Sequence, residues 1–97
     1  MLDGERRMEL VNKAIDDFGR LLCDYRKEHF LTLQDMSLLV GCSPSYIHRI
    51  ENKKRNPDMD FRIRILSAGM NWSAEDIYAY MEAFISKESK ERGNELE

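Results

Sequence analysis

The sequence has little of the material that several protein classes require. Its two cysteines, Cys23 and Cys42, exclude a disulfide-rich scaffold and a four-cysteine zinc site. Its longest aliphatic run, Leu38-Leu39-Val40, is far too short for a transmembrane helix. The first seven residues contain no apolar signal segment. We therefore expect a cytoplasmic protein with reduced thiols and no membrane association.

Signatures of catalysis and of cofactor binding are also missing. The chain has no glycine-rich phosphate loop, no Ser-His-Asp set on a recognisable scaffold and no paired carboxylates in an obvious cleft. His29 and His48 do not combine with the two cysteines in any zinc-binding spacing. We predict that the chain is not an enzyme and carries no cofactor or metal.

The charge of the chain is unevenly distributed. The net charge is −3, so the chain as a whole is not a basic nucleic-acid binder. Residues 44–65 nevertheless carry six basic and three acidic side chains, a local charge of +3, whereas residues 73–97 carry three basic and seven acidic ones, a local charge of −4. A basic stretch within an acidic chain can bind phosphates on one face. The alternative is that Lys53, Lys54 and Arg55 form a solvated turn.

Helical periodicity dominates the chain, which contains only two prolines and five glycines. It predicts an all-α domain of five helices, over residues 5–28, 33–40, 44–52, 59–68 and 74–86. A break in the first helix, between Asp16 and Gly19, is left open because glycine weakens a helix interior. In the second helix the inward side chains are predicted to be Met36, Leu39 and Val40. We divide the chain into an N-terminal helical extension (1–15), a central domain (16–78) and a C-terminal helix end with a charged tail (79–97).

Two of these helices meet at a corner of three or four residues. Gly41 can adopt the positive φ that such a corner needs, and Ser43 caps the following helix, which starts at Pro44. This is the layout of a helix-turn-helix unit. The second helix of the unit turns Ile47 and Ile50 inward, and it presents a polar and basic outer face that ends in Lys53-Lys54-Arg55.

The run from Thr32 to Pro57 resembles the Cro/repressor-type (xenobiotic-response-element) helix-turn-helix family of bacterial and phage transcription regulators. The run that carries the resemblance is Gly41, the Ser43 cap, Ser-Tyr-Ile-His-Arg-Ile-Glu over 45–51, then basic residues and Asn-Pro. The resemblance extends from Phe18 to Ile77. It implies a five-helix repressor-like domain that binds double-stranded operator DNA, usually as a dimer, in the cytoplasm and at the nucleoid. It also implies that Arg26 pairs with Glu51.

The resemblance further assigns roles to individual side chains. The base-reading positions of the helix over 44–52 are Ser45, Tyr46, His48 and Arg49. The phosphate-contacting positions are Thr32, Gln34, Ser43, Asn52, Lys53, Lys54 and Arg55. Arg49 is the candidate for a bidentate contact to guanine. The chain departs from the family pattern at Leu33 and Pro44, which replace polar side chains and weaken the expectation of high sequence specificity.

The last helix is more apolar than one core face requires. We predict that it forms a homodimer interface, with Ile77, Tyr80, Met81, Phe84 and Ile85 as candidates; the alternative is that residues 1–15 cover it within one chain. The sequence thus predicts a sequence-specific transcriptional regulator, a repressor, that inserts the helix over 44–52 into the major groove. The alternative function is a protein-interaction module on the same fold, an antirepressor or antitoxin-like subunit with a regulatory protein partner and weak DNA binding.

Overall fold

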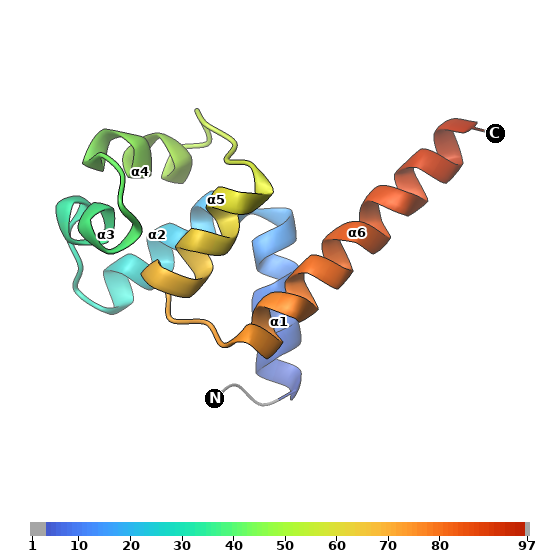
Figure 1. Cartoon of the computed structure of the whole chain (residues 1–97), viewed down its shortest axis with the longest axis horizontal. Coiled ribbons are helices and arrows are strands. Elements are labelled where there is room, and N and C mark those ends of the chain that lie inside the picture. Colours follow the sequence, from blue (N-terminus) through green and yellow to red (C-terminus); the bar gives the residue numbers. More distant parts are fainter. Residues whose placement is uncertain (1–3, 97) are drawn as a thin grey trace.

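The structure is a computed structural model that describes residues 4–96, and their side chains as far as residue 90 (Figure 1). Within this part of the chain all regular structure is helical, which confirms the all-α prediction. The elements are α1 (Gly4–Asp16), α2 (Phe18–Glu28), α3 (Leu33–Val40), α4 (Pro44–Glu51), α5 (Met59–Arg64), the π-helical turn η1 (Ile65–Gly69) and α6 (Ala74–Leu96). None of the described helices combines the length and the apolar composition that a bilayer crossing demands.

The first predicted helix is two helices, so the described chain has six α-helices where the sequence predicted five. The break falls at Asp17, whose backbone leaves the helical region (φ −154°, ψ 75°). Its side chain accepts a hydrogen bond from the amide of Arg20 and caps α2. Position 19 requires a glycine because α2 passes close to the end of α4. A Cβ at this position would lie 2.3 Å from the carbonyl oxygen of Ile50.

One apolar core joins the helices. Its buried members are Val11, Ala14, Phe18, Leu21, Leu22, Met36, Val40, Ile47, Ile50, Ile65, Leu66, Met70, Ile77 and Tyr80. The prediction for Leu39 was wrong, because its side chain is half exposed. The short helix α3 instead buries Ser37, which it can do because the Ser37 hydroxyl donates to the carbonyl of Gln34 at 2.7 Å.

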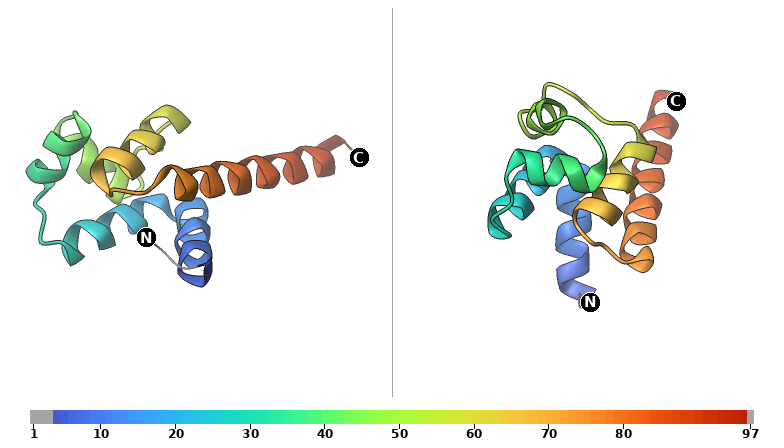
Figure 2. Two further views of the ribbon diagram at one scale, coloured as in Figure 1. Left: turned by 60° about the horizontal axis from the view of Figure 1, so that its bottom comes forward. Right: turned by 60° about the vertical axis from the view of Figure 1, so that its left-hand side comes forward.

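The last helix packs against α1 with its first half and extends beyond the body with its second half (Figure 2). It ends at Leu96 and not near Ser86, where the sequence predicted its end. Ile77 and Tyr80 lie in the core of their own chain, so the prediction that they form a dimer interface is corrected. Met81 and Phe84 are half-buried and Ile85 is exposed. The helix α1 therefore covers part of the apolar surface of α6, as the alternative required.

Candidate nucleic-acid interface

The corner between α3 and α4 has the local structure that its sequence predicts. The hydroxyl of Thr32 accepts a hydrogen bond from the amide of Asp35, and the Asp35 carboxylate accepts one from the amide of Thr32, both at 2.9 Å. This reciprocal capping box starts α3. Gly41 ends α3 at φ +86°, in the left-handed region. Two residues after Gly41, the Ser43 hydroxyl accepts a hydrogen bond from the amide of Tyr46 at 3.1 Å and caps α4, which begins at Pro44. No residue other than glycine has a positive φ between the two helices.

The helix α4 lies at the top of the molecule in Figure 1, away from the N-terminal end of α1. It buries Ile47 and Ile50, which are at most 2% exposed, and leaves Ser45, His48 and Arg49 exposed. This confirms the predicted inward and outward faces. The outward face is polar and basic and carries no acidic side chain.

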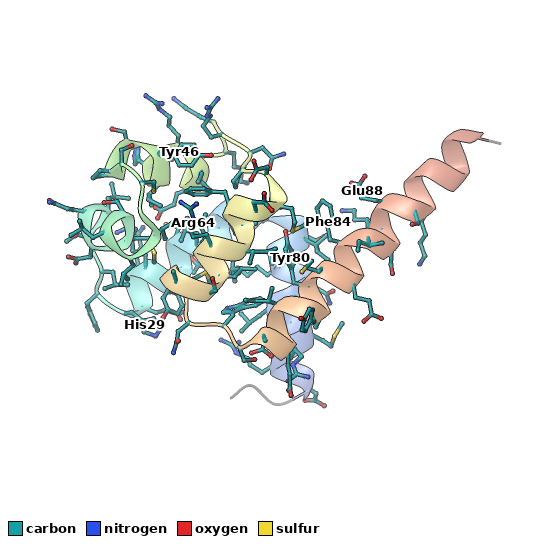
Figure 3. All side chains as sticks on the ribbon, viewed as in Figure 1. His29, Tyr46, Arg64, Tyr80, Phe84 and Glu88 are labelled. Carbon is teal, nitrogen blue, oxygen red and sulfur yellow. The ribbon has the colours of Figure 1, made fainter. Side chains whose placement is uncertain are left out.

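Tyr46 does not belong fully to the outward face. Its ring is half-buried and meets the ring of Phe61 edge-on, with 5.0 Å between the ring centroids. The guanidinium of Arg55 lies 5.8 Å from the centroid of the Tyr46 ring. The guanidinium of Arg64, which is labelled in Figure 3, lies 5.2 Å from the centroid of the Phe61 ring on the same helix, α5. Tyr46 therefore supports the position of a neighbouring cation as well as packing on the body.

A buried ion pair fixes the end of α4. Arg26 of α2 donates two hydrogen bonds to the carboxylate of Glu51, at 2.7 and 3.0 Å, and a third to the carbonyl of Leu31 at 2.9 Å. The Glu51 carboxylate is only 5% exposed, and the paired hydrogen bonds raise the pKa of the Arg26 guanidinium although burial opposes the charge. The pairing that the family resemblance implied is confirmed. It ties α4 to α2, so that α4 has one orientation.

The basic turn after α4 is an ordered helix end. The amide of Lys53 donates to Ile50 at 3.1 Å and the amide of Lys54 to Arg49 at 2.8 Å, the two bonds of a Schellman motif. Lys53 adopts φ +63°, a left-handed conformation that costs a non-glycine residue about 1–2 kcal/mol. The Asn52 amide group donates to the carbonyl of His48 at 2.8 Å. The turn is thus held in one shape by the helix that it follows.

The cations of this region differ in their partners, and Arg55 and Arg64 lie over aromatic rings. Arg49 and Lys54 are exposed and have no ion-pair partner among the described residues. Lys53 is exposed too, but its ammonium group lies 3.1 Å from the carboxylate of Asp17. Arg62 is buried: it donates to the carbonyl of Pro57, to the hydroxyl of Tyr80 and to the side chain of Asn56.

Arg62 is one of the six basic residues counted between positions 44 and 65, but its burial keeps its charge away from a ligand. The Cζ atom of Arg62 lies 5.1 Å from the centroid of the Phe18 ring and 5.8 Å from that of the Phe84 ring, so the guanidinium packs within the core. A signal was present in the sequence, because positions 62, 65, 66 and 69 form the i, i+3, i+4, i+7 stripe of the buried face. Asp17 was also missed; its sign was an N-cap residue directly before Phe18-Gly19.

The remaining predicted phosphate contacts lie at helix starts. Thr32, Gln34 and Ser43 are exposed and stand at the N-termini of α3 and α4, where free amides favour anions. The hydroxyl oxygens of Thr32 and Ser43 accept capping bonds, and each O–H can still donate. Ser43 stands before α4, and Lys54 and Arg55 follow it, so exposed donors lie at both ends of this helix.

Comparison with known proteins bears on this region. Residues 24–68 match a family model described as helix-turn-helix, and this segment runs from α2 through α3, α4 and α5 into η1. No match was found among curated proteins or among solved structures. The matched segment contains Arg26, Glu51 and every residue assigned to base or phosphate contact.

Proposed function

We propose that this protein is a sequence-specific transcriptional repressor. The match of residues 24–68 to a helix-turn-helix family model supports this proposal, together with the resemblance of the segment 32–57 to regulators of the Cro/repressor type. In this proposal α4 enters the major groove of operator DNA, which is wide enough to admit an α-helix. One observation carries the proposal: the exposed face of α4 is polar and basic, while both ends of the helix are held by caps and by the Arg26–Glu51 pair.

The exposed side chains of α4 suit base reading. Arg49 has no ion-pair partner among residues 4–90, and its guanidinium can donate two hydrogen bonds to guanine. Ser45 and His48 share its exposed surface and can donate to or accept from base edges. We assign Tyr46 a smaller part, because its ring is half-buried beside Phe61 and carries Arg55.

The surrounding donors suit the DNA backbone. Phosphate contacts set the position of a protein on the duplex without carrying sequence information. We assign this role to side chains that flank α4 on both sides: Thr32, Gln34, Ser43, Asn52, Lys54 and Arg55. Lys53 is left out of this set because its ammonium group pairs with Asp17.

We also propose that the protein binds its operator as a homodimer through α6. Met81 and Phe84 are half-buried, and Tyr78 and Ile85 are 68% and 60% exposed. These side chains leave an apolar strip on α6 next to the part that α1 covers. A two-fold dimer would present two copies of α4 to half-sites about 34 Å apart, one turn of DNA. Light scattering tests this: a mass of 11.5 kDa at high concentration would contradict it, and Ile85→Glu should dissociate a dimer of twice that mass.

The test of DNA binding starts from selection of a duplex out of a random library, followed by fluorescence anisotropy over a range of salt concentrations. We expect affinity to fall steeply with salt. Arg49→Ala should cost about 1–3 kcal/mol on the selected duplex and relax the preference at one base pair. Lys54→Ala should weaken all duplexes alike and lower the salt slope by about 0.9.

Lys90→Ala is the matched control, because this lysine is exposed on the part of α6 that extends away from α4. It should leave the slope unchanged. A flat salt response, or Arg49 and Lys54 variants that bind like wild type, would refute groove insertion of α4. That result would favour the protein-interaction module on the same fold. Repression itself is tested with a reporter whose promoter overlaps the selected site.

A further inference from the structure

One ion pair connects the break between α1 and α2 to the basic turn after α4. The Nζ atom of Lys53 lies 3.1 Å from Oδ2 of Asp17. Asp17 lies outside the segment that matches the helix-turn-helix family, whereas Lys53 lies inside it, at a position assigned by resemblance to phosphate contact. An acidic side chain therefore stands beside a surface proposed to bind a polyanion.

The carboxylate of Asp17 is held in place. Its Oδ1 accepts a hydrogen bond from the amide of Arg20 at 3.2 Å, as the cap of α2. The first turn of α2 in turn lies against the end of α4, where Gly19 leaves no room for a Cβ beside Ile50. The hydrogen bond from Lys53 lowers the pKa of Asp17, and the capping bond acts in the same direction against the effect of burial. Asp17 is thus a stationary negative charge at neutral pH.

The backbone of Lys53 is held equally well. Its left-handed φ and the two Schellman hydrogen bonds around it determine where its side chain leaves the turn. Its ammonium group meets Asp17, while Lys54 and Arg55, the next two cations, make no ion pair among the described residues. The three consecutive cations are therefore not equivalent.

We propose that Asp17 is an intramolecular counter-ion that keeps Lys53 from the DNA phosphates, so that the turn offers two cations to the backbone, Lys54 and Arg55, instead of three. This inference rests on the proposed DNA binding. It makes Asp17 a positioning residue that lowers affinity: it removes one counterion-releasing contact, and its own charge repels the duplex.

Salt titration distinguishes a lysine that contacts phosphate from one that does not, because each contact to B-DNA adds about 0.9 to the slope of log affinity against log salt. Four variants are compared with wild type on one duplex: Asp17→Asn, Lys53→Gln, the double variant and Lys54→Gln. Asn keeps the side-chain oxygen that caps α2, and circular dichroism with thermal unfolding checks that each variant folds.

We expect Lys54→Gln to lower the slope by about 0.9 and Lys53→Gln to leave it unchanged. Asp17→Asn should steepen the slope by about 0.9, so that a rise from 50 to 200 mM salt costs it about 3.5-fold more affinity than it costs wild type. The double variant should lose this gain. In NMR spectra of the lysine ammonium groups, DNA should shift the signal of Lys54 and leave that of Lys53 in place.

The opposite pattern overturns the inference: Lys53→Gln lowers the slope as much as Lys54→Gln does, and Asp17→Asn has no effect. The wild-type salt slope distinguishes a failure of this inference from a failure of the proposed DNA binding. A steep wild-type slope with that opposite pattern refutes only the counter-ion role of Asp17. A flat wild-type response refutes the proposed DNA binding, and the inference with it.

Discussion

The surface around α4 and the surface where α1 meets α2 and α6 differ in how their charged side chains are paired. Around α4, Arg49 and Lys54 are exposed without an ion-pair partner among the described residues. At the α1 surface, Arg7 contacts Asp76 at 2.7 Å, and Asp24 binds both Lys13 and Arg20. In Figure 1, α4 lies at the upper left, whereas the first half of α1 and the start of α6 lie at the bottom.

The difference separates charges that hold helices together from charges that are free for a ligand. The opposite charge of an ion-pair partner largely cancels the field of a cation, so a paired cation attracts a polyanion only weakly. The Arg26–Glu51 pair belongs to the first kind, although Glu51 is the last residue of α4. The role of a charged side chain therefore depends on its ion-pair partner and not on its distance from the proposed interface.

The largest effect on stability should come from breaking the buried pair. Arg26→Met leaves the Glu51 carboxylate buried without its partner and should lower the free energy of unfolding by about 3–5 kcal/mol. Urea denaturation measures this. The control is the double variant Arg26→Met/Glu51→Leu, which removes the stranded charge and should regain a large part of the loss. A single variant as stable as wild type would mean that the pair does not hold α4.

A smaller loss is expected where α2 lies against α4 without any charge. Gly19→Ala pushes a Cβ against the carbonyl oxygen of Ile50, and the helices must move apart at a cost of about 1–3 kcal/mol. Gly4→Ala is the matched control, since nothing lies within 4 Å of its Cβ. Thermal unfolding of the two variants compares them. Equal stabilities would show that the contact between α2 and α4 yields easily.

The paired surface should not contribute to DNA affinity. Arg7→Gln removes the partner of Asp76, whose side chain is 5% exposed, and should lower stability by about 1–3 kcal/mol. Its salt slope with DNA should equal that of wild type, in contrast to Lys54→Gln. Anisotropy titrations on the same duplex give the answer. A reduced slope would place DNA on the α1 surface and end the distinction between the two regions.

The smallest effect is the acid sensitivity of the paired surface. Hydrogen bonding by Lys13 lowers the pKa of Asp24 below its ordinary value of 3.8. Burial acts to raise the pKa of Asp76, but the bonds from Arg7 and Ser73 outweigh it and the pKa is lowered. Such groups stabilise the fold above their unfolded pKa and lose this contribution as pH falls through the folded one. Urea midpoints should therefore be level from pH 7 to 5 and fall below about pH 4.

Asp24→Asn is the control for this profile, since it should make the fall below pH 4 shallower. Midpoints that rise on acidification would contradict the assignment of these pairs as stabilising.

Much of the helix-turn-helix unit could be predicted from residues close together in the chain. A cap involves positions within about four residues, so Thr32, Gly41 and Ser43 signal where α3 ends and α4 begins. The faces of α4 follow from the spacing of Ile47 and Ile50. The Arg26–Glu51 pair was predicted by resemblance to a family and not by local pattern.

The errors share a physical reason. Leu39, Arg62, Ile77 and Tyr80 all lie on helices that the sequence predicted, but burial depends on what each helix meets. Arg62 can be buried because the loop before α5 supplies Asn56 and Pro57 as acceptors and α6 supplies Tyr80, and only the packing of α6 brings the last of these near. Apolar residues of α6 are buried because the chain changes direction at Asp17, between α1 and α2, and α1 packs against α6.

Local chemistry was thus enough for the helices, their caps and the exposed cationic face of α4, because helix formation and capping depend on neighbours in the chain. The partner of each charge was decided by tertiary packing. Lys53 meets Asp17 across 36 positions only because α2 begins against the end of α4. Long-range electrostatic partners follow from where the helices lie in space, and no periodicity along the chain encodes that placement.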